Sequence, residues 1–292
     1  TGYTGYYANV DGKITNNGVE ILLSGKAIEN KEFSWDIGLN FGKNKNIVKE
    51  LPEGMDLLEL GDNAGLASTK TVFIPGEEYG ILYGSRWMRN EDGQRVIDEN
   101  GLPVKDTVNG IVGNPNPDWT LGISNTLKYK GFTLDFLFDI KSGGDVYNGT
   151  ANVMRTLGTH EDTENREETV VFDGVVYDEA NDQWLENNTE VKWGDYYQNY
   201  GLVHVSEAGI EEASWVRLKQ LSLSYSLPSK TLENFMLSGL TFSLSGNNLL
   251  LFTDYDGIDP ETNLSGVSNS TGRDYFNMPS VRSYTFSVKM TF

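Results

Sequence analysis

Seven segments of the chain alternate apolar and polar residues with a period of two. From Phe33 to Phe41, for example, every odd position is bulky and apolar, and every even position is small or polar. Successive side chains of a β-strand point to opposite faces, so each segment has one apolar face and one polar face. We therefore predict an all-β, antiparallel fold with strands near 19–28, 33–43, 118–129, 132–141, 215–227, 240–252 and 282–292.

A soluble β-sandwich also has one apolar face per strand, but three features favour a transmembrane β-barrel. The segments run roughly 9–14 residues, close to the ~9–11 residues that cross the hydrocarbon core at a tilt. Their polar faces carry small residues, as in the wall of a water-filled lumen. Aromatic residues such as Phe41, Trp119 and Tyr129 lie near the segment ends, as in the aromatic girdle of outer-membrane barrels.

The connectors between the segments alternate strictly between short and long. The short ones are Glu29–Glu32, Lys130–Gly131 and Pro228–Gly239, and we expect a short helix over 230–237 capped by Ser229 in the last of them. Bacterial barrels have short periplasmic turns and long external loops. We therefore expect three long extracellular loops, at 44–117, 142–213 and 253–281.

The charge balance restricts the classes of partner. The 292 residues include 23 Lys and Arg against 42 Asp and Glu, a net charge of −19, which argues against nucleic acid because phosphate binding needs a basic face. Connector 142–213 alone holds 16 acidic and 3 basic residues, or −13. Such a loop repels anionic substrates within roughly a Debye length of ~8 Å, so neutral glycans or peptides fit better.

Candidate functional residues are few, and they lie in the long connectors. Aromatic rings stack on sugars or anchor interfaces, so the expected substrate-binding residues are Trp87, Trp184, Trp193, Tyr196 and Tyr197. These aromatic residues could equally belong to a solvated surface loop without a ligand.

The sequence contains one weak candidate for a metal site. Asp254, Asp256 and Asp259 are spaced around Gly257 in a way that resembles part of a calcium loop, although the flanking helices and the final glutamate of an EF-hand are missing. An ordered turn explains the same residues. His160 beside Asp162 is a lone histidine and gives little support for a metal or for catalysis. With no cysteine and no recognisable nucleophile or phosphate loop, we expect neither an enzyme nor a bound cofactor.

Several short motifs occur along the chain in a fixed order. They are Asn17–Glu20, Asn114–Asp118, Ala213–Lys219, Leu221–Pro228, Ser245–Leu250, Tyr255–Glu261, Met278–Pro279, Arg282 and the terminal Phe292. As an ordered set covering nearly the whole chain, they resemble SusC/RagA-type TonB-linked transporters of the outer membrane of Gram-negative, Bacteroidetes-like bacteria.

The resemblance implies a barrel of 22 strands around a plug, of which this chain supplies about seven C-terminal strands. It implies import of large nutrients, with glycans or oligosaccharides as the main expected substrates and oligopeptides as the other expected class. The implied partners are a SusD-like surface lipoprotein and the TonB–ExbB–ExbD system, which acts through a plug region that this chain lacks. In that family, the terminal Phe292 resembles a barrel-assembly signal; an ordinary interfacial aromatic residue is the alternative.

Two other functions explain part of the same pattern. A secreted all-β carbohydrate-binding or adhesion module also has acidic, aromatic loops, but it requires the apolar face around Phe33 and Trp35 to be a protein core. A passive porin requires neither TonB nor a plug. Folding without detergent would favour the first alternative, and uptake independent of the proton-motive force would favour the second.

Overall fold

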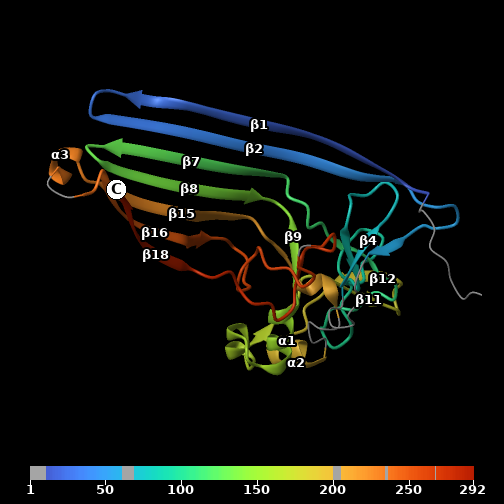
Figure 1. The fold of residues 1–292 in the computed structure, drawn as a ribbon. Coiled ribbons are helices and arrows are strands. Elements are labelled where there is room, and N and C mark those ends of the chain that lie inside the picture. Colours follow the sequence, from blue (N-terminus) through green and yellow to red (C-terminus); the bar gives the residue numbers. More distant parts are fainter. Residues whose placement is uncertain (1–10, 61–68, 200–204, 234–235, 267) are drawn as a thin grey trace, which may run out of the picture.

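A computed structural model describes residues 11–60, 69–199, 205–233, 236–266 and 268–292. Within them, seven strands form one antiparallel sheet in which each strand pairs with the next along the chain (Figure 1). The predicted all-β antiparallel fold is confirmed. The strands are β1 (Lys13–Glu29), β2 (Phe33–Glu50), β7 (Trp119–Tyr129), β8 (Phe132–Ser142), β15 (Trp215–Ser226), β16 (Gly239–Phe252) and β18 (Ser283–Thr291).

The first two strands are longer than the sequence pattern indicates. β1 begins at Lys13 rather than near residue 19, and β2 continues to Glu50 rather than to 43. The added segments pair with each other, with Asn16 opposite Asn46. The extension carries asparagine and other polar residues on both faces, and asparagine is unfavourable in strands. It therefore shows no alternation of apolar and polar residues from which the sequence could predict it.

The short connectors lie together at one end of the sheet (Figure 1). Lys130 and Gly131 both have positive φ, at 44° and 87°, as a two-residue type I′ hairpin turn requires. In the described residues, the helix of the third short connector is shorter than the predicted 230–237, since α3 covers Ser229–Leu232; residues 234–235 of the prediction lie outside the described chain. Ser229 is not its cap, because Pro228 occupies that position and offers no side-chain hydrogen bond.

The strand register places the alternating apolar residues of all seven strands on one face, whereas a few others, such as Leu22 and Leu137, lie on the polar face. Leu23, Leu39, Ile123 and Phe138 form one row across four neighbouring strands. A bulge in β15 between Leu218 and Gln220 keeps the row continuous. Because one extra residue there shifts the alternation, Leu218 and the later apolar residues of β15 remain on the same face.

This apolar face is not covered by other described residues. Leu23 and Phe286 expose 58% and 68% of their surface, and among the described residues only Val48 and Leu218 of the seven strands belong to the buried apolar set. The opposite face is polar and hydrogen-bonded: for instance, Thr126 donates to Asp135 at 2.6 Å. The sheet is therefore a thin wall with an apolar side and a polar side, and it contains almost no core of its own.

The buried core lies instead in the three long connectors, which gather at the other end of the sheet (Figure 1). We call the described residues of 44–117, 142–213 and 253–281 that lie outside the seven strands the loop body. None of the helices in the described chain is long and apolar enough to span a membrane. The loop body contains a four-stranded sheet of β3 (Leu58–Leu60), β4 (Thr69–Phe73), β5 (Ile81–Gly84) and β6 (Gly110–Gly113).

Smaller elements complete the loop body. β9 lies between β14 and β17 and so joins connector 142–213 to connector 253–281. The elements are β9 (Asp145–Asn148), α1 (Gly149–Leu157), η1 (Glu161–Asn165), β10 (Thr169–Val170), β11 (Val175–Asp178), β12 (Gln183–Glu186), β13 (Val191–Lys192), α2 (Trp193–Asn199), η2 (Ser206–Gly209), β14 (Ile210–Glu212) and β17 (Arg273–Asp274).

Candidate functional site

A buried ion pair fixes the loop body to the sheet. Arg217 of β15 contacts Asp259 of connector 253–281, with Nη2 and Oδ1 2.6 Å apart, and the two side chains are only 3% and 4% exposed. Burial alone would raise the pKa of Asp259, but hydrogen bonds from Ser280 and from the Glu261 N–H, together with Arg217, hold that pKa below its usual value. The charge of Asp259 is therefore paired rather than available to a ligand.

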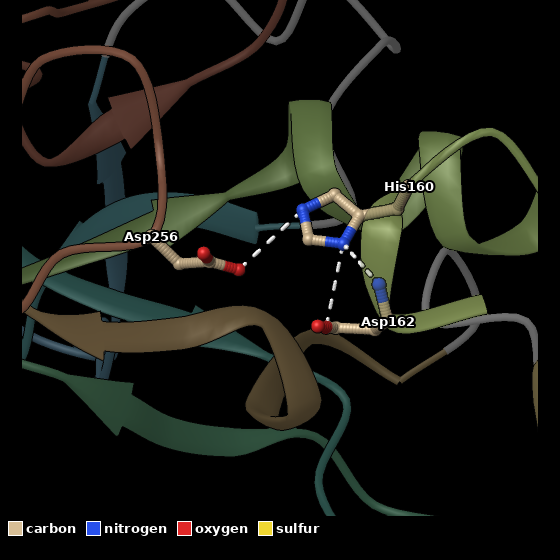
Figure 2. A group of neighbouring side chains, drawn as sticks. All are labelled: His160, Asp162 and Asp256. Carbon is tan, nitrogen blue, oxygen red and sulfur yellow. Dashed lines mark hydrogen bonds and ion pairs between the residues drawn. The ribbon is translucent and has the colours of Figure 1, made fainter. Parts of the chain in front are cut away.

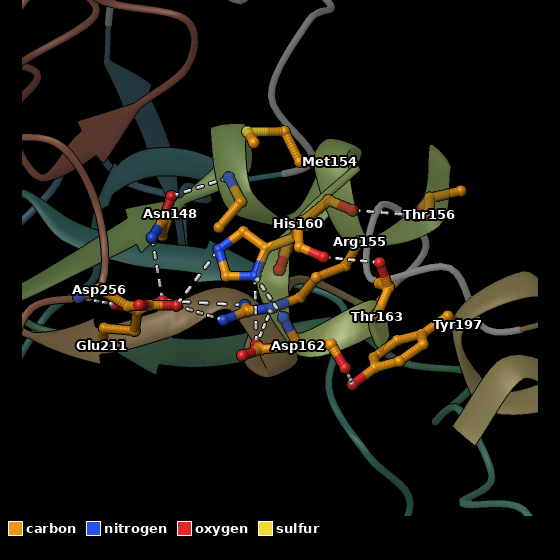
Figure 3. A network of polar contacts seen from close by, with 12 residues as sticks. Asn148, Met154, Arg155, Thr156, His160, Asp162, Thr163, Tyr197, Glu211 and Asp256 are labelled. Atoms are coloured by element: carbon orange, nitrogen blue, oxygen red, sulfur yellow. Dashed lines mark hydrogen bonds and ion pairs between the residues drawn. The ribbon is translucent and has the colours of Figure 1, made fainter. Parts of the chain in front are cut away.

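A second charged network, the Arg155 cluster, joins two of the long connectors (Figure 3). Arg155 of α1 donates from Nε to Asp162 at 2.7 Å and from Nη2 to Asp256 at 2.6 Å. Its Nη1 lies 3.9 Å from Glu211, which also accepts the backbone N–H of Asp256 at 2.9 Å. Burial raises the pKa of Glu211. The cluster therefore holds Asp256 of connector 253–281 against three residues of connector 142–213.

His160 also belongs to this cluster (Figure 3), and Figure 2 shows its contacts with Asp162 and Asp256. Its Nδ1 accepts the backbone N–H of Asp162 at 3.3 Å, which caps η1, and its Nε2 lies 3.4 Å from Asp256 Oδ2. Within the described residues, His160, Asp162 and Asp256 are the group with ligand atoms close enough for one metal ion. The carboxylate oxygens nearest the imidazole are the ones that bind Arg155, so a guanidinium already supplies the cation.

The three aspartates that made the calcium candidate have three different environments. Asp254 is exposed, Asp256 binds Arg155, and Asp259 is buried against Arg217. Two of the three carboxylates are thus neutralised by arginines far away in the sequence. This arrangement does not favour a calcium loop, and calcium binding stays a prediction that nothing else supports.

Four of the five predicted aromatic residues come together in one aromatic cluster with Phe172. Trp193 and Tyr197 stack at 5.7 Å between ring centroids, and Tyr196 lies 4.7 Å from Phe172. Trp87 reaches the cluster from connector 44–117 and lies 6.3 Å from Tyr196. Trp87 is only 3% exposed, so it packs behind the other rings rather than offering a face to a ligand.

Connector 44–117 is held at the aromatic cluster by Glu207 of η2. The backbone N–H of Trp87 donates to Glu207 at 2.8 Å, and Arg89 forms an ion pair with the same carboxylate. The sequence pattern indicates neither this contact nor the position of Phe172. Both depend on residues that are far apart in the chain and become neighbours only in the folded loop body.

A cavity of about 370 Å³ opens beside the aromatic cluster. Burial raises the pKa of Tyr196 to about 12, so its hydroxyl stays protonated at neutral pH. The cavity combines flat apolar surfaces with polar groups, which is the composition of sites for small polar ligands. It is lined by Arg155, Asp162, Asn165, Trp193, Tyr196, Tyr197 and Ala208.

The remaining two predicted residues lie elsewhere. Trp184 on β12 is 38% exposed and packs against Tyr177 at 5.0 Å, and it lines a different cavity with Arg89 and Arg95. Phe292 ends the chain with 88% of its surface exposed. Its expected part in barrel assembly stays a prediction.

No protein-family model matches this chain. Among curated proteins it is similar to TonB-dependent receptor P3 of Formosa agariphila, at 28% identity, with 99% of this chain and 30% of that protein covered. TonB-dependent receptor SusC of Bacteroides thetaiotaomicron is 24% identical over 88% of this chain and 25% of its own length. The chain thus spans about 30% of the length of the curated relatives that it matches over its whole length. The relatives are named as receptors, not as enzymes.

The fold is similar to a solved structure described as the RagAB peptide transporter. The TM-score is 0.68, at 22% identity, and the match covers 100% of this chain and 31% of that one. A structure of the same importer in an open state matches with the same TM-score. The predicted resemblance to SusC/RagA-type TonB-dependent transporters is therefore confirmed, and the seven-stranded sheet corresponds in fold to part of such a barrel.

Proposed function

We propose that this chain, a relative of TonB-dependent receptors, forms one part of the wall and the outer mouth of an outer-membrane importer. The observation that carries the proposal is the uncovered apolar face of the seven-stranded sheet. Leu23, Tyr284 and Phe286 each expose more than half of their surface there, and large exposed apolar surfaces mark contact with lipid or protein. Lipid tails are the cover that suits a face which continues across every strand.

The polar face of the sheet would line the conduit. Asp36, Asp135 and Ser224 project from it, on the side opposite to the apolar rows. No group in this wall performs chemistry on the substrate. The wall supplies hydrogen-bonding groups along a path, and the loop body supplies an aromatic cavity at the entrance.

The substrate class that fits this surface is a neutral glycan or an oligopeptide. Connector 142–213 contributes a charge of −13, which repels polyanions near its surface. Among the similar solved structures, one is described as a peptide transporter, which supports the oligopeptide class; the glycan class rests on the resemblance of the sequence motifs. A SusD-like lipoprotein above the loop body and the TonB–ExbB–ExbD system acting through a plug are the partners that we propose with it.

A secreted binding module is less well supported. It would need a second layer over the apolar face, and the described loop body covers the end of the sheet rather than that face (Figure 1). A passive porin is less well supported because the curated relatives are named TonB-dependent receptors, and a passive porin needs no TonB.

The test is to fractionate cells that make the protein containing this chain and to measure uptake with and without a proton-motive-force uncoupler. We expect the protein in the outer membrane, with extraction that requires detergent, and uptake that stops when the uncoupler is added. A substrate small enough for general porins serves as the control, since its uptake should persist. Recovery in the soluble periplasm would contradict the membrane assignment, and uptake insensitive to the uncoupler would contradict active import.

A further inference from the structure

Three aromatic side chains of helix α2 lie in contact with one another beside the cavity. Trp193, Tyr196 and Tyr197 have spacings of three and four residues, which place side chains on one face of a helix. Their ring centroids are 5.7, 5.8 and 5.9 Å apart. The planes of Trp193 and Tyr197 are 21° apart, whereas Tyr196 is turned by 77° from Trp193. The aromatic rings that line the cavity therefore present their faces in two different orientations.

Aromatic faces attract cations because the quadrupole of the ring is negative above and below its plane. This cluster already contains one such contact, since the guanidinium of Arg95 lies 5.8 Å from the ring centre of Trp87. Trp87 in turn lies 6.3 Å from Tyr196. The rings that line the cavity are thus the continuation of a surface that binds a cation within the protein.

The Arg155 cluster, which reaches the cavity through Arg155 and Asp162, carries a surplus of negative charge. Arg155 lines the cavity, but three carboxylates surround that guanidinium, at 2.6, 2.7 and 3.9 Å. With His160 counted as neutral, as in the net charge, the Arg155 cluster has one positive and three negative groups. Asp162 lines the cavity itself, with its Oδ2 bound by Arg155 Nε at 2.7 Å and its side chain 42% exposed, so a cation from solution would share this carboxylate with Arg155.

From these contacts we infer that the cavity binds a primary ammonium group carried by the imported molecule. The ammonium would lie over the rings of Trp193 and Tyr196, with Asp162 as its counter-ion. A cavity of about 370 Å³ accepts an ammonium together with its alkyl or sugar stem. The two sources of this chemistry are a lysine-type side chain and an amino sugar. The inference rests on the proposed function for the origin of the ligand, but binding is measured without transport.

The experiment measures binding to the intact, detergent-solubilised protein by isothermal titration. The probes are end-blocked Gly-Lys-Gly, Gly-Gln-Gly and Gly-Glu-Gly, with glucosamine and glucose as the sugar pair. We expect the lysine peptide to bind about 5-fold or more tightly than the glutamine peptide, since a cation–π contact with a counter-ion supplies this order of selectivity. The glutamate peptide should bind most weakly. Selectivity for glucosamine over glucose, without selectivity among the peptides, would identify the amino sugar as the source.

Matched variants connect the selectivity to the cavity. Asp162→Asn and Tyr196→Leu should each remove most of the ammonium preference, whereas Tyr196→Phe should keep it because the ring remains. Glu179→Gln, at an exposed position of the same connector, removes one charge without touching the cavity and should leave the preference intact. Near-ultraviolet circular dichroism checks that each variant is folded.

Two results would overturn the inference. One is equal binding of the charged and uncharged member of both probe pairs. The other is an ammonium preference that persists unchanged in folded Asp162→Asn and Tyr196→Leu. Neither result affects the fractionation or the uncoupler assay, so failure of the ammonium site is distinguishable from failure of the importer assignment.

Discussion

The sheet and the loop body of this protein are stabilised in opposite ways. The sheet is held by backbone hydrogen bonds across seven strands, and its apolar side chains are outside. The loop body has the usual arrangement of a water-soluble protein, with Val72, Leu82 and Val205 fully buried inside it. The difference indicates that the two regions have different surroundings. Apolar side chains point outward from the sheet because its surroundings are apolar, and they point inward in the loop body because its surroundings are water.

The boundary between the two regions gives the largest expected effect. Asp259→Asn removes the buried counter-charge of Arg217 and leaves only the half-buried Glu261, whose Oε2 lies 3.2 Å from Arg217 Nε, so the loss in unfolding free energy should reach about 3–5 kcal/mol at most. Denaturant unfolding in detergent measures the loss. Lys26→Gln removes an exposed cation paired with Glu29 and is the control, with little expected change. A small effect of Asp259→Asn would mean that the loop body is not fixed to the sheet by this pair.

Core truncation compares the two regions directly. Leu82→Ala in β5, where the side chain is 0% exposed, should cost about 2–5 kcal/mol by leaving a cavity. Leu244→Ala on the apolar face of β16, where the side chain is 58% exposed, should cost much less in the same detergent unfolding assay. Equal losses would indicate that the apolar face is a protein core after all.

Charge insertion distinguishes the two faces of the wall. Ile123 lies in an apolar row between Leu39 and Phe138, and its neighbour Ser124 points to the polar face. Ile123→Arg should destabilise the membrane-inserted protein by about 2–4 kcal/mol, whereas Ser124→Arg should be tolerated. Refolding into lipid vesicles, followed by the heat-modified shift in gel mobility, measures both. A reversed order would place lipid on the other face.

The smallest expected effect is the pH dependence of the boundary ion pair. The folded-state pKa of Asp259 is lowered, so its stabilising contribution is complete above the ordinary value of 3.8 and is lost as the pH falls below it. The difference in unfolding free energy between the wild type and Asp259→Asn should therefore shrink only below about pH 4. A difference that shrank between pH 8 and pH 6 would assign the effect to another group.

The sheet was predictable from the sequence because its signal is local. The alternation from Phe33 to Phe41 sets both faces of β2 without reference to any other segment. The strand pairing and the bulge near Gln220 contribute only the alignment of the apolar faces of neighbouring strands. The Asn-rich extension of β1 and β2 escaped prediction because polar residues on both faces leave no period to read.

The candidate site was predictable only in part. Residue type and loop position indicated Trp193, Tyr196 and Tyr197 as candidate substrate-binding residues, and that role stays a prediction; the structure places their three rings together on α2. Residue type and loop position did not indicate that Trp87 would be buried behind these rings, or that Asp256 and Asp259 would face two different arginines. Each of those outcomes depends on a contact between separate connectors.

The sequence by itself determined the class of this protein: alternating strands with one apolar and one polar face, short turns at one end, and an acidic set of long connectors at the other. Only the tertiary structure decided which connector residues meet, and therefore which carboxylates are neutralised and which rings remain open to a cavity. The physical reason is the range of the interactions. Strand faces follow from neighbours two residues apart, whereas the Arg155 cluster joins groups as far as 101 residues apart.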